Sequence, residues 1–260
     1  MKIEFKWTDE LESYPDRTAA VTGGRIRMML SGQNICRHYD QAEEEVGEWL
    51  IVPLVQVAEW LASNWFFLFY ETDSTPGPDF QRRHILSNIG EGFALPALRF
   101  QALGNIIGLS VRPYLHTFAK IDFTTVAEDE IQTEELDGEL RAFLNAVAER
   151  LEEAGIRDSS FQELWNTIND LDAAEFAFAK ACAEMGEHPF AIEDSLADAI
   201  VEANGYLPTY LKDDFYRIAR DLDLVDTAKM LGSSFEELYR RSSMLTDART
   251  IRTELGKVEQ

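Results

Sequence analysis

Residues 52–70, VPLVQVAEWLASNWFFLFY, are the most apolar stretch of the chain and decide how its first half folds. Six residues recur at the spacing of one helical face and predict a helix from residue 54 onward: Leu54, Val57, Ala58, Leu61, Trp65 and Leu68. Aromatic residues cover much of the remaining surface, so we expect burial on most sides. The stretch is long enough to span a membrane, but Gln56 and Glu59 interrupt it. It is therefore predicted to be the central core helix of an N-terminal module.

Strand patterns precede this helix. Residues 2–7 alternate apolar and polar side chains, as a half-buried strand does. Gly23-Gly24 is a turn signal, and residues 25–30 behind it predict a second strand that ends at Ser31-Gly32. Residues 48–52 predict a third strand, which leads through a proline into the helix.

Further strand patterns follow the helix. Residues 93–100 and 106–111 predict two strands joined in a hairpin around Gly104-Asn105. Residues 118–126 predict another strand. The acidic run 127–137 is expected to be a solvated segment that leads into a helix.

Beyond Glu135 the patterns are helical. An amphipathic stripe predicts one long helix that Gly155 ends, and its members are Leu136, Leu140, Phe143, Leu144, Val147 and Leu151. Ser159 or Ser160 is expected to cap the next helix, and more helices are predicted up to residue 244. The predicted fold class is therefore α+β, with a mixed strand/helix module at 1–130 and an all-helical module at 131–260.

The chain is strongly acidic. It has 47 Asp and Glu residues against 24 Lys and Arg residues, which gives a formal net charge of −23. Such a chain repels phosphate backbones and anionic lipids, so we expect neither direct nucleic-acid binding nor membrane binding. The acid at Glu4 stands where a signal peptide needs an apolar run, and the two cysteines form no disulfide framework. We therefore expect a cytoplasmic protein.

The motifs that carry chemistry are missing from the sequence. No His has another His three or four residues away, and there is no His-Glu-x-x-His helix, nucleophile elbow, phosphate loop or dinucleotide fingerprint. Cys36 and His38 are close in sequence but resemble neither a zinc finger nor a catalytic pair. We therefore predict no metal, no cofactor and no catalytic residue.

Three segments in order carry a family resemblance. The first is residues 52–71, the second is Arg83-His84-Ile85-Leu86 followed by residues 92–96, and the third is residues 175–190, which contain Met185-Gly186 and Pro189-Phe190. Together they resemble the N-terminal, non-catalytic region of bacterial proteins that carry an ImmA/IrrE-type metallopeptidase domain, often on phages or mobile elements. The peptidase's zinc motif is absent here, so the resemblance implies a sensing, scaffolding or partner-binding module and supplies no catalytic residue.

The leading hypothesis is a non-enzymatic regulatory module in bacterial prophage, stress or defence biology, which binds a protein partner, such as a metallopeptidase or regulator, or itself. One alternative is an acidic, DNA-mimic-like inhibitor of a nucleic-acid-binding protein. Another is an enzyme whose carboxylate site cannot be picked out among so many acids. If a ligand pocket exists, the predicted residues are Trp60, Trp65, Arg83, His84 and Glu91. The simpler interpretation places both tryptophans in the core and pairs Arg83 with an acid.

Overall fold

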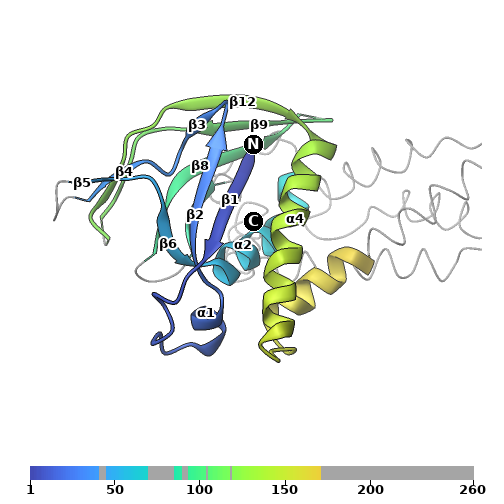
Figure 1. Cartoon of the computed structure of the whole chain (residues 1–260). Coiled ribbons are helices and arrows are strands. Elements are labelled where there is room, and N and C mark those ends of the chain that lie inside the picture. The colour runs from blue at the N-terminus through green and yellow to red at the C-terminus, as the bar shows by residue number, and fades with distance from the viewer. Residues whose placement is uncertain (41–44, 70–84, 90–92, 104, 118, 171–260) are drawn as a thin grey trace, which may run out of the picture. The chain divides into compact units, whose positions relative to one another are not determined.

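A computed structural model describes residues 1–40, 45–69, 85–89, 93–103, 105–117 and 119–170 (Figure 1). The chain divides into two compact units. One consists of Met1–Ala62 and Pro76–Glu163, and the other consists of Ser63–Thr75 and Leu164–Gln260. The described residues mix helices and antiparallel sheets, which confirms the α+β class. The predicted all-helical part from residue 171 onward lies outside them, and the boundary at residue 130 stays a prediction.

The first sheet, sheet A, is built around strand β2 (Gly23–Leu30). Strand β1 (Lys2–Trp7) pairs with one edge of β2, and the short strands β3 (Gln33–Asn34) and β6 (Leu50–Pro53) pair with the other. The predicted strand at residues 2–7 is therefore confirmed. The predicted turn at Gly23-Gly24 is wrong, because both glycines lie in β2. A Cβ at Gly24 would stand 2.5 Å from Leu54 Cδ1, so close packing against a helix explains this glycine.

The strand end predicted at Ser31-Gly32 is confirmed, and these two residues form a turn. Ser31 has φ 49° and Gly32 has φ 76°, and the residues that flank them, Leu30 and Gln33, pair directly. Two successive left-handed residues match the twist of the flanking strands, which is why such turns close tight hairpins.

Sheet B contains β10 (Tyr114–His116), β11 (Ile121–Phe123), β4 (His38–Asp40) and β5 (Glu45–Gly47), in that order. The strand predicted at residues 118–126 is shorter than expected. Lys120 has φ 54°, and the Ala119 N–H donates to His116 Nδ1 at 3.1 Å. Ala119 and Lys120 of the predicted strand therefore lie in a turn before β11.

Sheet C contains β12 (Ala127–Gln132), β9 (Ile106–Val111), β8 (Ala94–Ala102) and β7 (Ile85–Asn88). The predicted hairpin of β8 and β9 is confirmed by their register. The prediction of a solvated segment at residues 127–137 is wrong for its first half, because β12 pairs with β9 along its length. Ala127 and Ile131 are buried, Glu128 and Glu130 are exposed, and Asp129 on the side of the two apolar residues is half-buried, so the acidic composition hid a period-two pattern.

Three named helices accompany the sheets: α1 (Arg17–Val21), α2 (Leu54–Phe69) and α4 (Thr133–Glu153). Every residue of the two predicted apolar stripes is buried, which confirms both long helices. In Figure 1, α2 begins behind sheet A and α4 runs beside β1. Phe143 of α4 meets Phe5 of β1 edge-on, with ring centroids 5.4 Å apart. None of the helices in the described ranges has the length and apolarity needed to cross a membrane.

Two helix ends were also predicted correctly. Gly155 has φ 71°, its N–H donates to the Glu152 carbonyl, and the Ile156 N–H donates to the Leu151 carbonyl. These two bonds form a Schellman motif. Residues 160–170 are helical, and Ser159 caps them by accepting the Gln162 N–H at 3.2 Å.

Candidate binding surface

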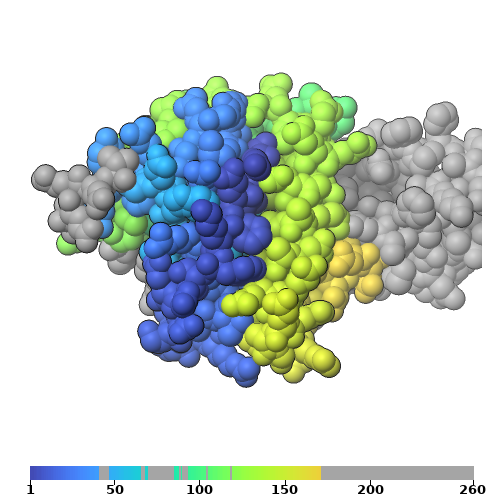
Figure 2. Space-filling view, viewed as in Figure 1, coloured from blue at the N-terminus to red at the C-terminus, as the bar shows by residue number. Residues whose placement is uncertain are grey.

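The alternation of β1 and β2 places cations on the outer side of sheet A. Ile3 of β1 and its pairing partner Met28 of β2 are buried. Side chains alternate along a strand, so the neighbours of Ile3 in β1 and of Met28 in β2 point outward. We call this surface the basic face, and its members are Lys2, Lys6, Arg25, Arg27, Trp49 and Ile51. In the space-filling view β1 and β2 lie at the surface beside α4 (Figure 2).

Trp49 is the aromatic centre of the basic face. Leu50 pairs with Ile26, which places Trp49 next to Arg27 in the register. The Arg27 Cζ atom lies 4.6 Å from the centroid of the Trp49 ring, and Lys6 Nζ lies 4.9 Å from it. The indole therefore reaches across β2 toward β1, and both cations lie within the range of a cation–π interaction.

Two carboxylates are part of the same surface. Glu4 accepts from Arg27 Nε at 2.6 Å and pairs with Lys2 at 3.1 Å, and Glu10 pairs with Arg25. The Arg27 guanidinium, helped by Lys2, lowers the pKa of Glu4 from its ordinary 4.5, and Arg25 lowers that of Glu10. Among the described residues of this surface, these four cations and two carboxylates sum to +2, whereas the whole chain carries −23.

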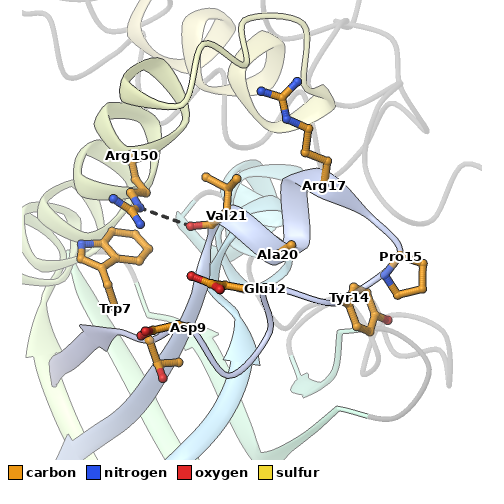
Figure 3. A pocket seen from close by; sticks show the side chains of 10 residues that line it. Trp7, Asp9, Glu12, Tyr14, Pro15, Arg17, Ala20, Val21 and Arg150 are labelled. Atoms are coloured by element: carbon orange, nitrogen blue, oxygen red, sulfur yellow. Dashed lines mark hydrogen bonds between the residues drawn. The ribbon is translucent and has the colours of Figure 1, made fainter.

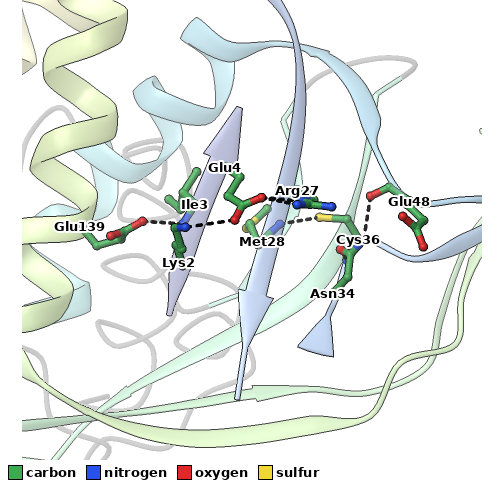
Figure 4. A network of polar contacts seen from close by, with 9 residues as sticks. All are labelled: Lys2, Ile3, Glu4, Arg27, Met28, Asn34, Cys36, Glu48 and Glu139. Carbon is green, nitrogen blue, oxygen red and sulfur yellow. Dashed lines mark hydrogen bonds and ion pairs between the residues drawn. The ribbon is translucent and has the colours of Figure 1, made fainter. Parts of the chain in front are cut away.

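Hydrogen bonds behind the basic face hold its strands in place (Figure 4). The Ile3 N–H donates to Glu139 Oε1 of α4 at 2.6 Å, and the Met28 N–H donates to Cys36 Sγ at 3.3 Å. Asn34 Nδ2 donates to the Glu48 carbonyl at 2.8 Å, just before Trp49. The backbone under the basic face is therefore anchored at these three points.

The Cys36–His38 segment shows no catalytic arrangement. Cys36 is fully buried, and this burial raises the pKa of its thiol to about 12. His38 Nδ1 lies 2.9 Å from the backbone carbonyl of Cys36. Within the ranges that the structure describes, no three His, Cys, Asp or Glu side chains gather in a group that could hold a metal ion.

The residues predicted to bind a ligand fall into two groups. Trp60 is half-buried, with its ring centroid 6.2 Å from that of Phe100. Trp65 is buried, with its ring 4.7 Å from that of Phe69 and 6.2 Å from that of Trp165. Both tryptophans therefore pack against other aromatic rings, each in its own unit.

The other three predicted residues, Arg83, His84 and Glu91, lie outside the described residues. A binding role for the set stays a prediction. The sequence does not predict the basic face, because the face forms only when β1, β2 and the segment at Trp49 are brought together by strand pairing. The signal was present in the sequence as Lys2-x-x-x-Lys6 and Arg25-x-Arg27.

A pocket of about 610 Å³ lies between the segment after β1, α1 and the end of α4 (Figure 3). Arg150 Nε donates to the Val21 carbonyl at 3.2 Å, and the Arg150 guanidinium lies 5.5 Å from the centroid of the Trp7 ring. Arg17 Nη2 donates to the Ala154 carbonyl at 3.2 Å. Each arginine thus binds a carbonyl at the end of the other helix, so both guanidiniums join α1 to α4.

Comparison with protein families, with curated proteins and with solved structures finds no match to this chain.

Proposed function

We propose that this chain is a non-enzymatic, partner-binding module that acts through protein–protein contacts made by the basic face. The observation that carries the proposal is the cluster in which Lys6 and Arg27 both lie against the Trp49 ring, on the outer side of sheet A, in a chain of net charge −23. Tryptophan and arginine are the residues that most often supply binding energy at protein interfaces. A rigid surface that carries both needs little ordering when a partner binds.

The lowered pKa values of two carboxylates and the raised pKa of one thiol give these three groups no role as an acid or base at neutral pH. A general acid or base works best with a pKa near the working pH. The pKa values of Glu4 and Glu10 are lowered, so both carboxylates are ionised at neutral pH, and the Cys36 thiol, with a pKa of about 12, stays protonated. At neutral pH the two carboxylates keep their negative charge and the thiol stays neutral, so the charge pattern of this surface does not change with small changes of pH.

The proposal includes the setting that the sequence predicts. The family resemblance favours a bacterial prophage, stress or defence system, with a metallopeptidase, a regulator or a second copy of this chain as partner. The helical module at 131–260 would then be an accessory part of a cytoplasmic protein. The net charge of −23 disfavours nucleic acid and anionic membranes as direct ligands.

The test is affinity purification of the tagged chain from its native host, with wild type compared with Arg25→Glu and Arg112→Glu. Arg25 pairs with Glu10 on the basic face, and Arg112 pairs with Glu128 of sheet C, so both substitutions reverse one exposed, paired arginine. We expect a co-purifying protein that Arg25→Glu loses and Arg112→Glu retains. Equal recovery with all three chains would contradict the proposal.

A second candidate, the DNA-mimic-like inhibitor, is supported by a row of carboxylates. Glu128 and Glu130 are exposed on β12, and Glu134 and Glu135 follow in the first turn of α4. This candidate predicts that Glu128→Lys combined with Glu130→Lys abolishes capture of a nucleic-acid-binding protein, and that salt releases it. Substitutions on the basic face would leave that capture unchanged.

A further inference from the structure

We infer that the basic face binds a carboxylate-rich, extended segment of a partner protein, centred on Trp49. This inference rests on the proposed function and specifies the chemistry of the partner. Its starting point is charge complementarity, because the basic face is positive in a chain that is negative overall.

The spacing of the cations fits an extended segment. Arg25 and Arg27 are two residues apart on β2 and point to the same side. Side chains at such positions are about 6.5–7 Å apart along a strand. Carboxylates at alternate positions of an extended peptide repeat at the same distance, so a segment lying along β2 can bring one acid to each arginine.

The existing ion pairs leave room for a second carboxylate. One oxygen of Glu10 accepts from both Nε and Nη2 of Arg25. One oxygen of Glu4 is likewise paired with both Nε and Nη2 of Arg27. A guanidinium has five N–H donors, and exposed ion pairs are weak, so each arginine can also donate to a partner. Lys6 supplies a third positive charge beside the indole.

The apolar members of the basic face define the rest of the segment. Ile51 is 42% exposed and pairs with Arg25 in the register, and Trp49 is half-buried. Both therefore have surface left to cover. Side chains between the acids of an extended segment point away from the sheet, so apolar residues next to the acidic stretch would cover Trp49 and Ile51 while the carboxylates meet the cations.

A protein segment suits this surface better than a nucleic acid does. Glu4 and Glu10 would stand against phosphates, whereas peptide N–H groups or a basic side chain of a partner can donate to them. Each added phosphate also increases the repulsion from a chain of net charge −23. A short segment with few carboxylates meets much less of this repulsion.

The experiment measures fluorescence anisotropy of labelled probes with the full chain. The first probe is a synthetic peptide in which Glu alternates with Thr, the second has Gln in place of Glu, and the third is single-stranded oligothymidine. We expect the Glu peptide to bind at least about 10-fold more tightly than the Gln peptide, and added salt to weaken it.

Variants then locate the binding. Lys6→Glu and Arg25→Glu should each weaken binding of the Glu peptide by at least about 10-fold, and Arg112→Glu should leave it unchanged. Equal affinity for both peptides, binding of oligothymidine alone, or insensitivity to the basic-face variants would each overturn the inference. If no probe binds but Arg25→Glu still loses a partner from the host, the inference is wrong and the proposed function stands. If the Glu peptide binds but Arg25→Glu loses no partner from the host, the inference stands and the proposed function is wrong.

Discussion

Cys36 illustrates at the residue scale how burial sets side-chain chemistry. Its thiol has no exposed surface, and its Sγ accepts the Met28 N–H. Removal from water disfavours the thiolate more than this hydrogen bond favours it, so the pKa rises from 9.0 to about 12. The sequence placed Cys36 near His38, but only the fold shows that the thiol lies inside the protein.

We predict that Cys36 is unreactive in the folded chain. A Cys182→Ser background leaves Cys36 as the single cysteine. Because its pKa rises from 9.0 to about 12 on folding, the folded state contains about 1000-fold less Cys36 thiolate at pH 8 than the unfolded state. An aromatic disulfide reagent should therefore label Cys36 slowly under native conditions and fast in denaturant. Fast native labelling would show that the thiol is accessible.

The same residue makes stability depend on pH. Because its pKa is higher in the folded state, its contribution to the free energy of unfolding is complete below pH 9.0 and falls as the pH rises toward 12. In a Cys36→Ser variant this part of the alkaline loss should disappear, which urea unfolding at several pH values can measure.

At the scale of elements, α4 carries two glycines in opposite situations. Gly138 lies inside the helix with open space around its Cα, and Gly155 lies just beyond the helix end with φ 71°. Gly138 lowers the helix propensity of α4 because glycine has no side chain that restricts the backbone. Gly155 needs a left-handed conformation that L side chains rarely adopt.

We predict that Gly138→Ala stabilises the protein by about 0.5–1 kcal/mol and that Gly155→Ala destabilises it by about 1 kcal/mol. Each adds one methyl group to the same helix, so each controls for the other. Urea unfolding followed by circular dichroism should show midpoints shifted in opposite directions. A shift in the same direction for both would contradict the described end of α4.

Periodicity explains which elements the sequence could predict. The stripes of α2 and α4 and the alternation of β1 depend on neighbouring residues only, and all three were predicted correctly. Strand β12 was missed because its acidic residues dominate its composition. What makes it a strand is its pairing with β9, and local sequence carries little of that information.

At the scale of the whole molecule, charge is the dominant property. A net charge of −23 makes the compact state repel itself, and ions screen exposed charges over about 8 Å at physiological ionic strength. The exposed pairs Arg25–Glu10 and Arg112–Glu128 are weakened by the same screening. Since exposed pairs contribute little each, repulsion should prevail.

We therefore predict that the melting temperature rises as sodium chloride increases from low concentration to about 0.15 M. Differential scanning calorimetry measures this directly. Choline chloride at equal ionic strength should produce the same rise, because screening is independent of the cation. A falling melting temperature would mean that the ion pairs outweigh the repulsion.

The sequence by itself determined the α+β class, the two long helices, the strand β1, the β8–β9 hairpin and the acidic character of the chain. All of these depend on composition or on patterns within one segment. Only the tertiary structure decided that Gly23-Gly24 lies in a strand, that Cys36 is buried, and that both Lys6 and Arg27 lie against the Trp49 ring. The physical reason is that burial and cross-strand contact join residues far apart in sequence.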